Sequence, residues 1–386
     1  MDKIVVIIPT FNEKENINKM IDVLEEDIFP GIKKATLSIL VVDDKSPDGT
    51  ADVVKEKMKK YTNLELSLGD KQGLGAAYMR GMKYAMNEMK ADAVIEFDAD
   101  FQHDPKYIPQ LVEQFAVGFD HVIGSRGVAG GSVPNEWGIG RKFLTKFGGL
   151  FSRFVLFFPK VNVVKDTSTG LKLTKVHGIL DKVDFSKISN GFFYKTQILF
   201  QLVNMKAKIK EIPLEFKLRE VGQSKMTMKD IIGTFTAVIK LRLSDPNTIR
   251  IIKFGTVGFI GFVVNESFLF LFGNVMHFPE YLSWGFSTEL AIISNFIWNN
   301  IWTFQDKQIK GNTVVGKFLQ FNGTSLGALL IQTAVGAAGT YLLGEQYRLI
   351  LLPFIIAFLV LPYNYFMYTH VIWKTKTKSN PAIAKA

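Results

Sequence analysis

The chain has 386 residues, more than one ordinary domain holds, so two or more domains are expected. It contains no cysteine, which excludes disulfides and thiolate metal sites. The formal charge of +10 indicates an anionic partner, for which nucleic acid, phospholipid and a phosphorylated substrate are candidates, although basic flanks of membrane helices would also explain much of it.

Residues 1–245 have the pattern of a soluble α/β protein, with short apolar runs that alternate with helical patterns. This alternation predicts parallel β-α-β units, with ligands bound beyond the carboxyl ends of the strands. The first run follows Met1 too closely for a signal peptide, so this domain is expected in the cytoplasm. The predicted strands are 3–8, 36–42, 64–68, 93–97 and 121–123, and the predicted helices are 15–26, 51–60 and 75–88.

Residues 141–158 and 228–243 each combine an apolar face with basic side chains. Basic amphipathic helices rich in Phe are typical of the headgroup region of a bilayer. Periodicity alone is equally compatible with two ordinary core helices. Proximity to the apolar segments that follow favours the membrane surface.

Four apolar segments follow, at 251–272, 281–304, 318–343 and 349–373. Each is long enough for the roughly 20 residues that cross a bilayer. Lys and Arg are absent from 274–280, but they occur before the first segment, between the second and third, and after the fourth. This distribution predicts four spans with both termini cytoplasmic, and the alternative is a buried four-helix soluble domain. Glu266 and Glu289 lie inside these spans, where a carboxylate indicates either function or pairing with Lys253 or an Asn.

An acidic turn, Asp98-Ala99-Asp100, directly follows the strand 93–97. Two carboxylates at this spacing can share one hard divalent cation, Mg²⁺ or Mn²⁺, and a nucleotide diphosphate can complete its ligand shell. Such a cation neutralises charge on a leaving diphosphate. The motif is weak by itself, because acidic residues are common in turns after strands.

Polar residues also follow the first two strands. Phe11 and Glu13 come after the first strand, and the acidic segment 43–48 comes after the second. Carboxylates there can accept hydrogen bonds from a base or a ribose, and Phe11 can cover a base. The alternative is turn formation, with Asp48 or Thr50 capping the next helix.

These motifs resemble the successive motifs of family-2 glycosyltransferases, and within that family the dolichyl-phosphate mannose synthases. The resemblance covers about residues 4–228 and rests on VVIIPTFNEKENI, VVDDKSPDGT, KQGLGAAYMRGMKYA, FDADFQHDP and GSRGVAGG. Residues 249–373, with FGTVGFIGFVVNESFLFLF and NFIWNNIWTF, resemble the GtrA-like four-span domain fused to some of these synthases.

The resemblance implies an α/β GT-A fold with a mostly parallel sheet, followed by an all-α four-helix transmembrane domain. It implies inverting transfer of mannose from GDP-mannose to dolichyl (polyprenyl) phosphate, with no nucleic acid partner, to give a lipid-linked donor for protein glycosylation. The expected divisions are a catalytic domain at 1–227, an amphipathic linker at 228–248, the membrane domain at 249–373 and a basic tail at 374–386.

Site residues follow from the resemblance position by position. Phe11 stands where the family often has Tyr, and Lys195 is a weaker match. Asp166 is not expected to be catalytic. The nucleoside would contact Pro9, Phe11, Glu13, Val42 and Asp44. The diphosphate and metal site would use Asp98, Ala99, Asp100 and Gln102, of which Asp98, Asp100 and Gln102 would be the ligands of Mg²⁺ or Mn²⁺. Phosphates would contact Arg126, Arg219 and Lys225, and the acceptor loop would supply Arg141.

The chemistry of the acceptor leads independently to the arginines. A phosphate monoester has a second pKa near ~6 and is largely dianionic at neutral pH, so it can attack without a general base. The enzyme must instead hold two anions together, which guanidinium groups do well. Arg126, Arg141 and Arg219 are the candidates, although any one of them could be a solvated surface residue.

Three other activities are possible. A polyprenyl-phosphate glucosyltransferase would use UDP-glucose on the same scaffold. A lipid-linked sugar translocase would use the soluble domain only for binding. A processive polysaccharide synthase is disfavoured, because the Gln-x-x-Arg-Trp motif of that group does not occur.

Overall fold

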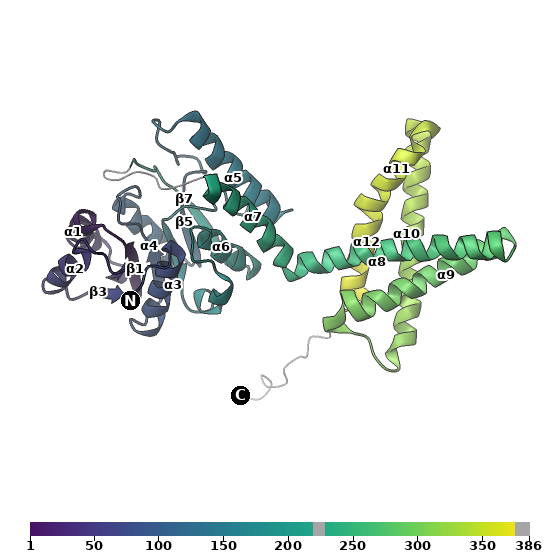
Figure 1. Ribbon diagram of the computed structural model, residues 1–386, viewed down its shortest axis with the longest axis horizontal. Helices are drawn as coiled ribbons and strands as arrows, with labels where there is room; N and C mark the ends of the chain where they lie inside the picture. Colours follow the sequence, from purple (N-terminus) through teal and green to yellow (C-terminus); the bar gives the residue numbers. More distant parts are fainter. Residues whose placement is uncertain (219–227, 375–386) are drawn as a thin grey trace. The chain divides into compact units, whose positions relative to one another are not determined.

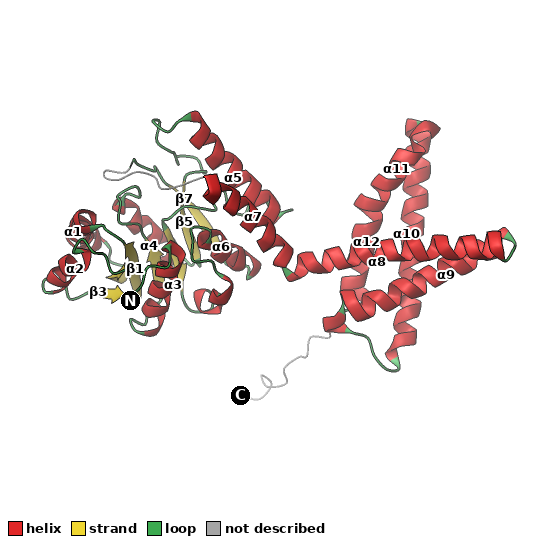
Figure 2. Ribbon diagram, in the orientation of Figure 1, coloured by secondary structure: helices red, strands yellow, loops and turns green. Residues whose placement is uncertain are grey.

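In the computed structural model the chain forms two compact units, Met1–Arg242 and Leu243–Ala386 (Figure 1). The structure describes residues 1–218 and 228–374. The first unit contains one seven-stranded sheet in the order β3-β2-β1-β4-β6-β5-β7, and the second unit is helical (Figure 2).

One half of the sheet is parallel. β1 (Asp2–Thr10) lies between β2 (Ala35–Asp43) and β4 (Ala93–Glu96), and β3 (Leu64–Leu68) forms the edge. The Ile and Val residues of β1 are buried on both faces, as is typical of a parallel strand covered by helices on both sides. With β5 (His121–Ser125), these strands confirm all five predicted from the sequence.

The other half of the sheet is mixed. β6 (Lys172–Lys175) lies antiparallel between β4 and β5, and β7 (Ile209–Pro213) pairs parallel with β5 at the far edge. Neither strand was predicted. β6 has only four residues, with the sequence KLTK, and therefore has no apolar run from which a strand could be predicted. Lys172 is nevertheless buried, at 2% exposed. The sheet is therefore mixed, with one antiparallel strand among mainly parallel ones.

Helices cover both faces of the sheet (Figure 2). Ile17, Val54 and Leu111 belong to a hydrophobic core on one face, and Tyr78 and Leu202 belong to a second core on the other. The helices that supply these residues are α1 (Lys14–Asp22), α2 (Thr50–Met58) and α4 (Ile108–Ala116) for the first core, and α3 (Leu74–Asn87) and α6 (Tyr194–Asn204) for the second.

The two amphipathic stretches form α5 (Ile139–Phe157) and α7 (Met228–Ser244), which pack against each other. The rings of Phe151 and Phe235 lie 4.9 Å apart, and Leu156 and Val238 share a buried cluster. The opposite face of α5 is open, where Phe154 is 59% exposed. One face of α5 therefore belongs to the core, as expected if the two stretches were ordinary core helices. The other face has exposed aromatic side chains.

The second unit contains α8 (Pro246–Phe270), α9 (Glu280–Trp298), α10 (Thr313–Leu343), α11 (Arg348–Ile355) and α12 (Leu361–Met367). Among the described residues, three helical segments are long and apolar enough to cross a membrane: Pro246–Val275, Thr313–Leu343 and Ile350–Ile372. α9 occupies the second predicted span but is not one of them, so the count of four is not confirmed. α9 contains the polar side chains of Ser283, Ser287, Glu289 and Asn295.

Polar side chains inside this unit find partners from other helices. Asn322 donates a hydrogen bond to Glu289, 3.3 Å away, so one of the two predicted pairings is confirmed. Lys253 instead donates to the carbonyl of Trp302 at 3.4 Å. Trp373, 1% exposed, donates from its indole to Asn300 at 3.0 Å. These three bonds pair polar groups within the protein, as groups that water does not reach require.

Candidate active site

The acidic turn begins where β4 ends. Phe101 adopts a left-handed conformation (φ 56°), which turns the chain back. The backbone N–H of Gln102 donates to Asp100 at 3.2 Å, and the amide of Gln102 donates to the carbonyl of Lys217 at 3.3 Å. The sequence Asp98 to Gln102 therefore forms a closed loop at the carboxyl edge of the sheet.

Asp98 is fixed by groups from three other segments. The Tyr78 hydroxyl donates to Oδ1 at 2.7 Å, and the Lys195 ammonium and His103 Nδ1 each lie 3.7 Å from Oδ2. Burial raises the pKa of Tyr78 well above its ordinary value, so the phenol remains a donor. Gly170 has no Cβ where one would overlap Oδ2. The weakest sequence match, Lys195, thus lies beside the acidic turn.

His103 is a neutral part of this cluster. Burial lowers its pKa to about 4, in spite of the nearby Asp98 carboxylate. The N–H of Gly170 donates to Nε2 at 3.3 Å, so the ring carries its proton on Nδ1, which faces Asp98. His103 therefore orients a hydrogen towards the carboxylate rather than a lone pair towards a metal.

The donor atoms of the turn suit a hard cation. Asp98, Asp100 and Gln102 offer carboxylate and amide oxygens, which Mg²⁺ and Mn²⁺ accept. Within 1–218 and 228–374, no cluster of three or more His, Asp or Glu side chains forms a metal cage. Mg²⁺ is commonly held by one or two carboxylates together with substrate phosphates and water, so the residues present fit such an ion.

The ends of β1 and β2 lie side by side, because their register pairs Pro9 with Val42 and Thr10 with Asp43. Asp43 accepts hydrogen bonds from the Thr10 hydroxyl at 2.9 Å and the Ser46 N–H at 2.8 Å. The next residues of the two chains, Phe11 and Asp44, therefore emerge together. The five residues expected at the nucleoside are Pro9, Phe11, Glu13, Val42 and Asp44, and all of them lie on these two strand ends or directly after them.

Two cations stand beside this pair of residues, and the sequence did not single out either. The Lys71 ammonium lies 3.2 Å from the centroid of the Phe11 ring. The Arg80 guanidinium donates to Asp44 at 2.7 Å. Both residues belong to the segment that follows β3. Because β3 pairs with β2, this segment begins next to the end of β2.

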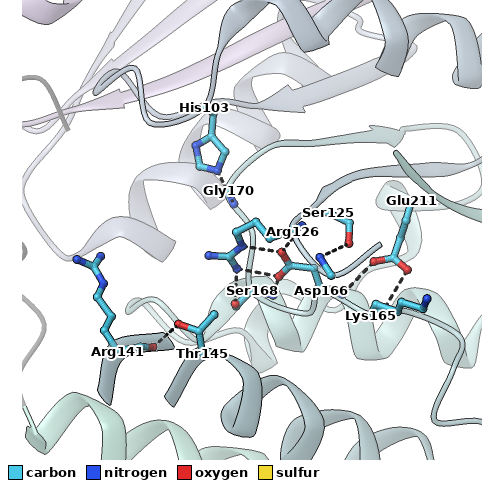
Figure 3. Close-up of polar contacts among 11 residues, drawn as sticks. His103, Ser125, Arg126, Arg141, Thr145, Lys165, Asp166, Ser168, Gly170 and Glu211 are labelled. Atoms are coloured by element: carbon cyan, nitrogen blue, oxygen red, sulfur yellow. Dashed lines mark hydrogen bonds and ion pairs between the residues drawn. The ribbon is translucent and has the colours of Figure 1, made fainter. Parts of the chain in front are cut away.

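Arg126, directly after β5, is held by Asp166. Its Nε and Nη2 donate to the two carboxylate oxygens at 2.7 and 2.8 Å, and Nη2 also donates to Ser168 at 3.0 Å (Figure 3). Burial alone would raise the pKa of Asp166, but the Arg126 guanidinium holds it well below its ordinary range. The N–H of Asp166 in turn donates to Glu211 at 2.9 Å. Arg126 is thus fixed in place with its charge compensated.

The rings of Phe216 and Trp137 contact each other and the side chains of His103, Arg126 and Arg141. The ring of Phe216 lies 5.0 Å from that of His103, 5.7 Å from that of Trp137 and 5.3 Å from the Arg126 guanidinium. The Arg141 guanidinium stacks 3.7 Å from the Trp137 ring. Figure 3 shows His103, Arg126 and Arg141 directed to the same region. His103, which lies beside Asp98, and the two arginines Arg126 and Arg141 therefore contact one aromatic pair. Arg219 and Lys225 lie outside the described residues.

The chain matches two family descriptions. Residues 5–172 match "Glycosyl transferase family 2", and residues 253–373 match "GtrA/DPMS, transmembrane domain". These matches and the three apolar helices identify a glycosyltransferase that is a membrane protein.

Similar curated proteins carry related names. A dolichol-phosphate mannosyltransferase of Pyrococcus furiosus is 33% identical over 97% of this chain and all of its own length. An undecaprenyl-phosphate mannosyltransferase of Micrococcus luteus is 33% identical, over 58% of this chain and 88% of its own. A polyprenol monophosphomannose synthase of Mycolicibacterium smegmatis is 32% identical, over 58% of this chain and 82% of its own.

Among solved structures, glucosyl-3-phosphoglycerate synthase from Mycobacterium tuberculosis, in complex with Mn²⁺, UDP and phosphoglyceric acid, aligns with 63% of this chain and 78% of its own. The identity is 17% and the TM-score 0.45. The identity to the Pyrococcus protein is 33% and extends over nearly the whole chain. The chain therefore belongs to the dolichol-phosphate mannosyltransferase family, whose catalytic part is a family-2 glycosyltransferase domain.

Proposed function

We propose that this protein transfers mannose from GDP-mannose to a polyprenyl phosphate such as dolichyl phosphate, with inversion at the anomeric carbon. The observation that carries the proposal is the gathering of Arg126, Arg141 and His103 around Phe216 and Trp137, with His103 beside Asp98 of the acidic turn. The names of the three relatives support mannose and a lipid phosphate.

In this reaction an oxygen of the acceptor phosphate forms a bond to C1 of mannose, and the bond from C1 to the β-phosphate of GDP breaks. The acceptor oxygen is already anionic, so no proton has to move. Asp98, Asp100 and Gln102 would hold the Mg²⁺ or Mn²⁺, which when bound neutralises charge on the departing diphosphate.

The residues of the chain bind and orient the two anions. Asp98 keeps one orientation because Tyr78 and Lys195 flank its two oxygens. Arg126 and Arg141 would bind the acceptor phosphate. The two hydrogen bonds to Asp166 would hold the Arg126 guanidinium in place. Arg219 and Lys225, assigned from the resemblance, would complete the contacts to phosphates, and Lys195 would add a further cation beside Asp98.

At the other end of the site, Phe11 would cover the base, and Asp44 and Glu13 would accept hydrogen bonds from the nucleoside. Pro9 and Val42 would shape the floor on which it lies. Ala99, 4% exposed, would let the diphosphate approach the turn closely. UDP-glucose is the competing donor, since the same elements can bind either nucleotide.

We also propose that the catalytic unit works at the cytoplasmic face of the cell membrane, with both termini on that side. The open aromatic face of α5, together with Ile232 and Ile239 of α7, would rest in the headgroup region and bring the lipid phosphate to Arg141. The residue divisions 1–227, 228–248, 249–373 and 374–386 belong to this proposal.

The direct test incubates the purified full-length protein with labelled GDP-mannose or UDP-glucose, Mg²⁺ or Mn²⁺, and a polyprenyl phosphate. Lipid-linked mannose is the expected product. Asp100→Asn and Arg126→Ala should each lower kcat by about two orders of magnitude or more, because each removes a charge that acts in the transition state. Asp52→Asn, an exposed carboxylate on α2, is the matched control. An unaffected rate in the Asp100 variant would exclude the cation site, and transfer of glucose alone would exclude mannose.

A further inference from the structure

The ion pair between Asp44 and Arg80 is a feature of the nucleoside end that the reaction as described does not use. Arg80 Nη2 donates to Asp44 Oδ1 at 2.7 Å. The Asp44 side chain is 7% exposed and that of Arg80 27%, so the pair is largely shielded from water. A shielded ion pair of this length holds both side chains in one orientation.

The surrounding backbone is shaped to admit the guanidinium. Gly69 lies between β3 and α3, and a Cβ at this position would overlap the guanidinium carbon of Arg80. The N–H of Gly69 donates to the carbonyl of Asp43 at 3.0 Å, which ties this connection to the end of β2. The Arg80 guanidinium therefore occupies the space that a Cβ at residue 69 would take.

The pair also leaves hydrogen-bonding capacity unused. A carboxylate has about four acceptor positions, and the contact to Arg80 is made at Oδ1. Among the described residues, the buried Nε of Arg80 has no hydrogen-bond partner, so the guanidinium is not held by a network of its own. Within the part of the chain that the structure describes, the guanidinium donates its hydrogen bond to Asp44, which favours a role through that carboxylate.

An ionised carboxylate at the edge of a base discriminates between bases. It accepts a hydrogen bond from a ring N–H, which guanine carries at N1 and uracil at N3. The corresponding ring nitrogen of adenine or cytosine carries a lone pair, which the carboxylate repels. Phe11 emerges beside Asp44 and can cover the base face, so Asp44 would meet the edge.

We infer that Arg80 is a positioning residue that fixes Asp44 as the base-reading carboxylate, and that the pair selects nucleotides whose base carries a ring N–H, guanine or uracil, over adenine and cytosine. The inference rests on the proposed function only in placing the nucleoside at Asp44. It assigns a specificity role to a residue of α3 that does not need to touch the donor.

Binding of GDP, UDP, ADP and CDP to the purified full-length protein with Mg²⁺, measured by calorimetry, tests the inference. The unaltered protein should bind GDP or UDP at least about tenfold more tightly than ADP and CDP, the ratio that ~1.4 kcal/mol of discrimination gives. Arg80→Ala should weaken binding of the preferred nucleotide about tenfold and reduce that ratio, and Arg80→Lys should restore part of both. In transfer assays Arg80→Ala should raise KM for the donor and leave kcat nearly unchanged.

Gly69→Ala provides a second variant, because it displaces the guanidinium without removing it and should reproduce the loss of discrimination. Lys83→Ala is the matched control, since Lys83 lies one turn further along α3 and lines the same cavity of about 460 Å³ as Arg80. Thermal unfolding of each variant separates misfolding from loss of selectivity.

Four results decide the matter. Unchanged affinity and ratio in Arg80→Ala, or an equal loss in Lys83→Ala, overturns the inference. Equal binding of GDP, UDP and ADP by the unaltered protein also overturns it. Selective binding of GDP without transfer of mannose would instead contradict the proposed function and support the inference, so the two failures are distinguishable.

Discussion

Asp43 in the parallel half of the sheet and Arg126 in the mixed half are charged side chains that are held in different ways. In the parallel half, Asp43 is held by neutral donors, Thr10 and Ser46, from the two strand ends that it joins. In the mixed half, Arg126 is held by a carboxylate 40 residues away, and both side chains are nearly buried, at 13% and 6% exposed. Removing one partner from a buried ion pair leaves an uncompensated charge, so single substitutions should cost more in the mixed half.

The largest effect is expected for Asp166→Asn. The variant leaves the Arg126 guanidinium buried without its counter-charge, which should lower the free energy of unfolding by about 3–5 kcal/mol and reduce transfer severely. Urea unfolding of the purified protein and the transfer assay measure the two effects.

The double variant Arg126→Met/Asp166→Leu serves as the control. It removes both charges and should recover much of the lost stability without recovering transfer. If the single variant proved as stable as the double, the ion pair would not be the interaction that distinguishes the mixed half.

The next effect concerns His121, which is 1% exposed in β5 and contacts the Thr174 hydroxyl of β6 at 2.9 Å. Burial lowers its pKa from 6.5 to about 3, so the ring is neutral in the folded protein. Below pH 6.5 the unfolded chain binds a proton here that the folded protein does not, so stability falls as pH falls from 6.5 towards 3. The loss from this group approaches about 1.4 kcal/mol per pH unit.

Unfolding free energies between pH 7 and pH 4.5 test this expectation. His121→Gln should show a shallower fall than the unaltered protein, and the exposed His177→Gln should show the same fall as the unaltered protein. Parallel curves for all three proteins would mean that the mixed half does not add this acid sensitivity.

A smaller effect is expected for Asp43→Asn in the parallel half. The new amide would place a donor against the Ser46 N–H or the Thr10 hydroxyl, at a cost of about 1–2 kcal/mol of stability. The displaced strand end should raise KM for GDP-mannose more than it lowers kcat. A loss of stability as large as that of Asp166→Asn would erase the contrast between the two halves.

The same contrast explains what the sequence could predict. The residues of the parallel half lie in contiguous motifs at the ends of strands with strong apolar runs, so β1, β2 and the acidic turn follow from local pattern. In the mixed half, the polar strand β6 has no such pattern, and a lysine such as Lys172 would be expected at the surface although it is buried.

The partners of the site were missed for a related reason. Tyr78, Asp166 and Phe216 act through contacts with residues 20 to 113 positions away, for which one sequence holds no signal. The sequence analysis expected no catalytic role for Asp166, and the structure shows it paired with Arg126. The roles of the predicted site residues themselves stay predictions, although the placement of Phe11, Asp44, Asp98 and Arg126 just after β1, β2, β4 and β5 favours them.

The smallest effect on stability is expected for Phe154→Ser on the open face of α5. Phe154 is 59% exposed, so the substitution should change the free energy of unfolding by no more than about 0.5 kcal/mol. If this face rests in the headgroup region, the variant should transfer mannose more slowly to a long polyprenyl phosphate in vesicles but not to a short, water-soluble acceptor. Phe151→Ser, which removes the ring packed against Phe235, should lose stability and slow both reactions. Equal rates of Phe154→Ser and the unaltered protein on both acceptors would show that the open face of α5 takes no part in presenting the lipid.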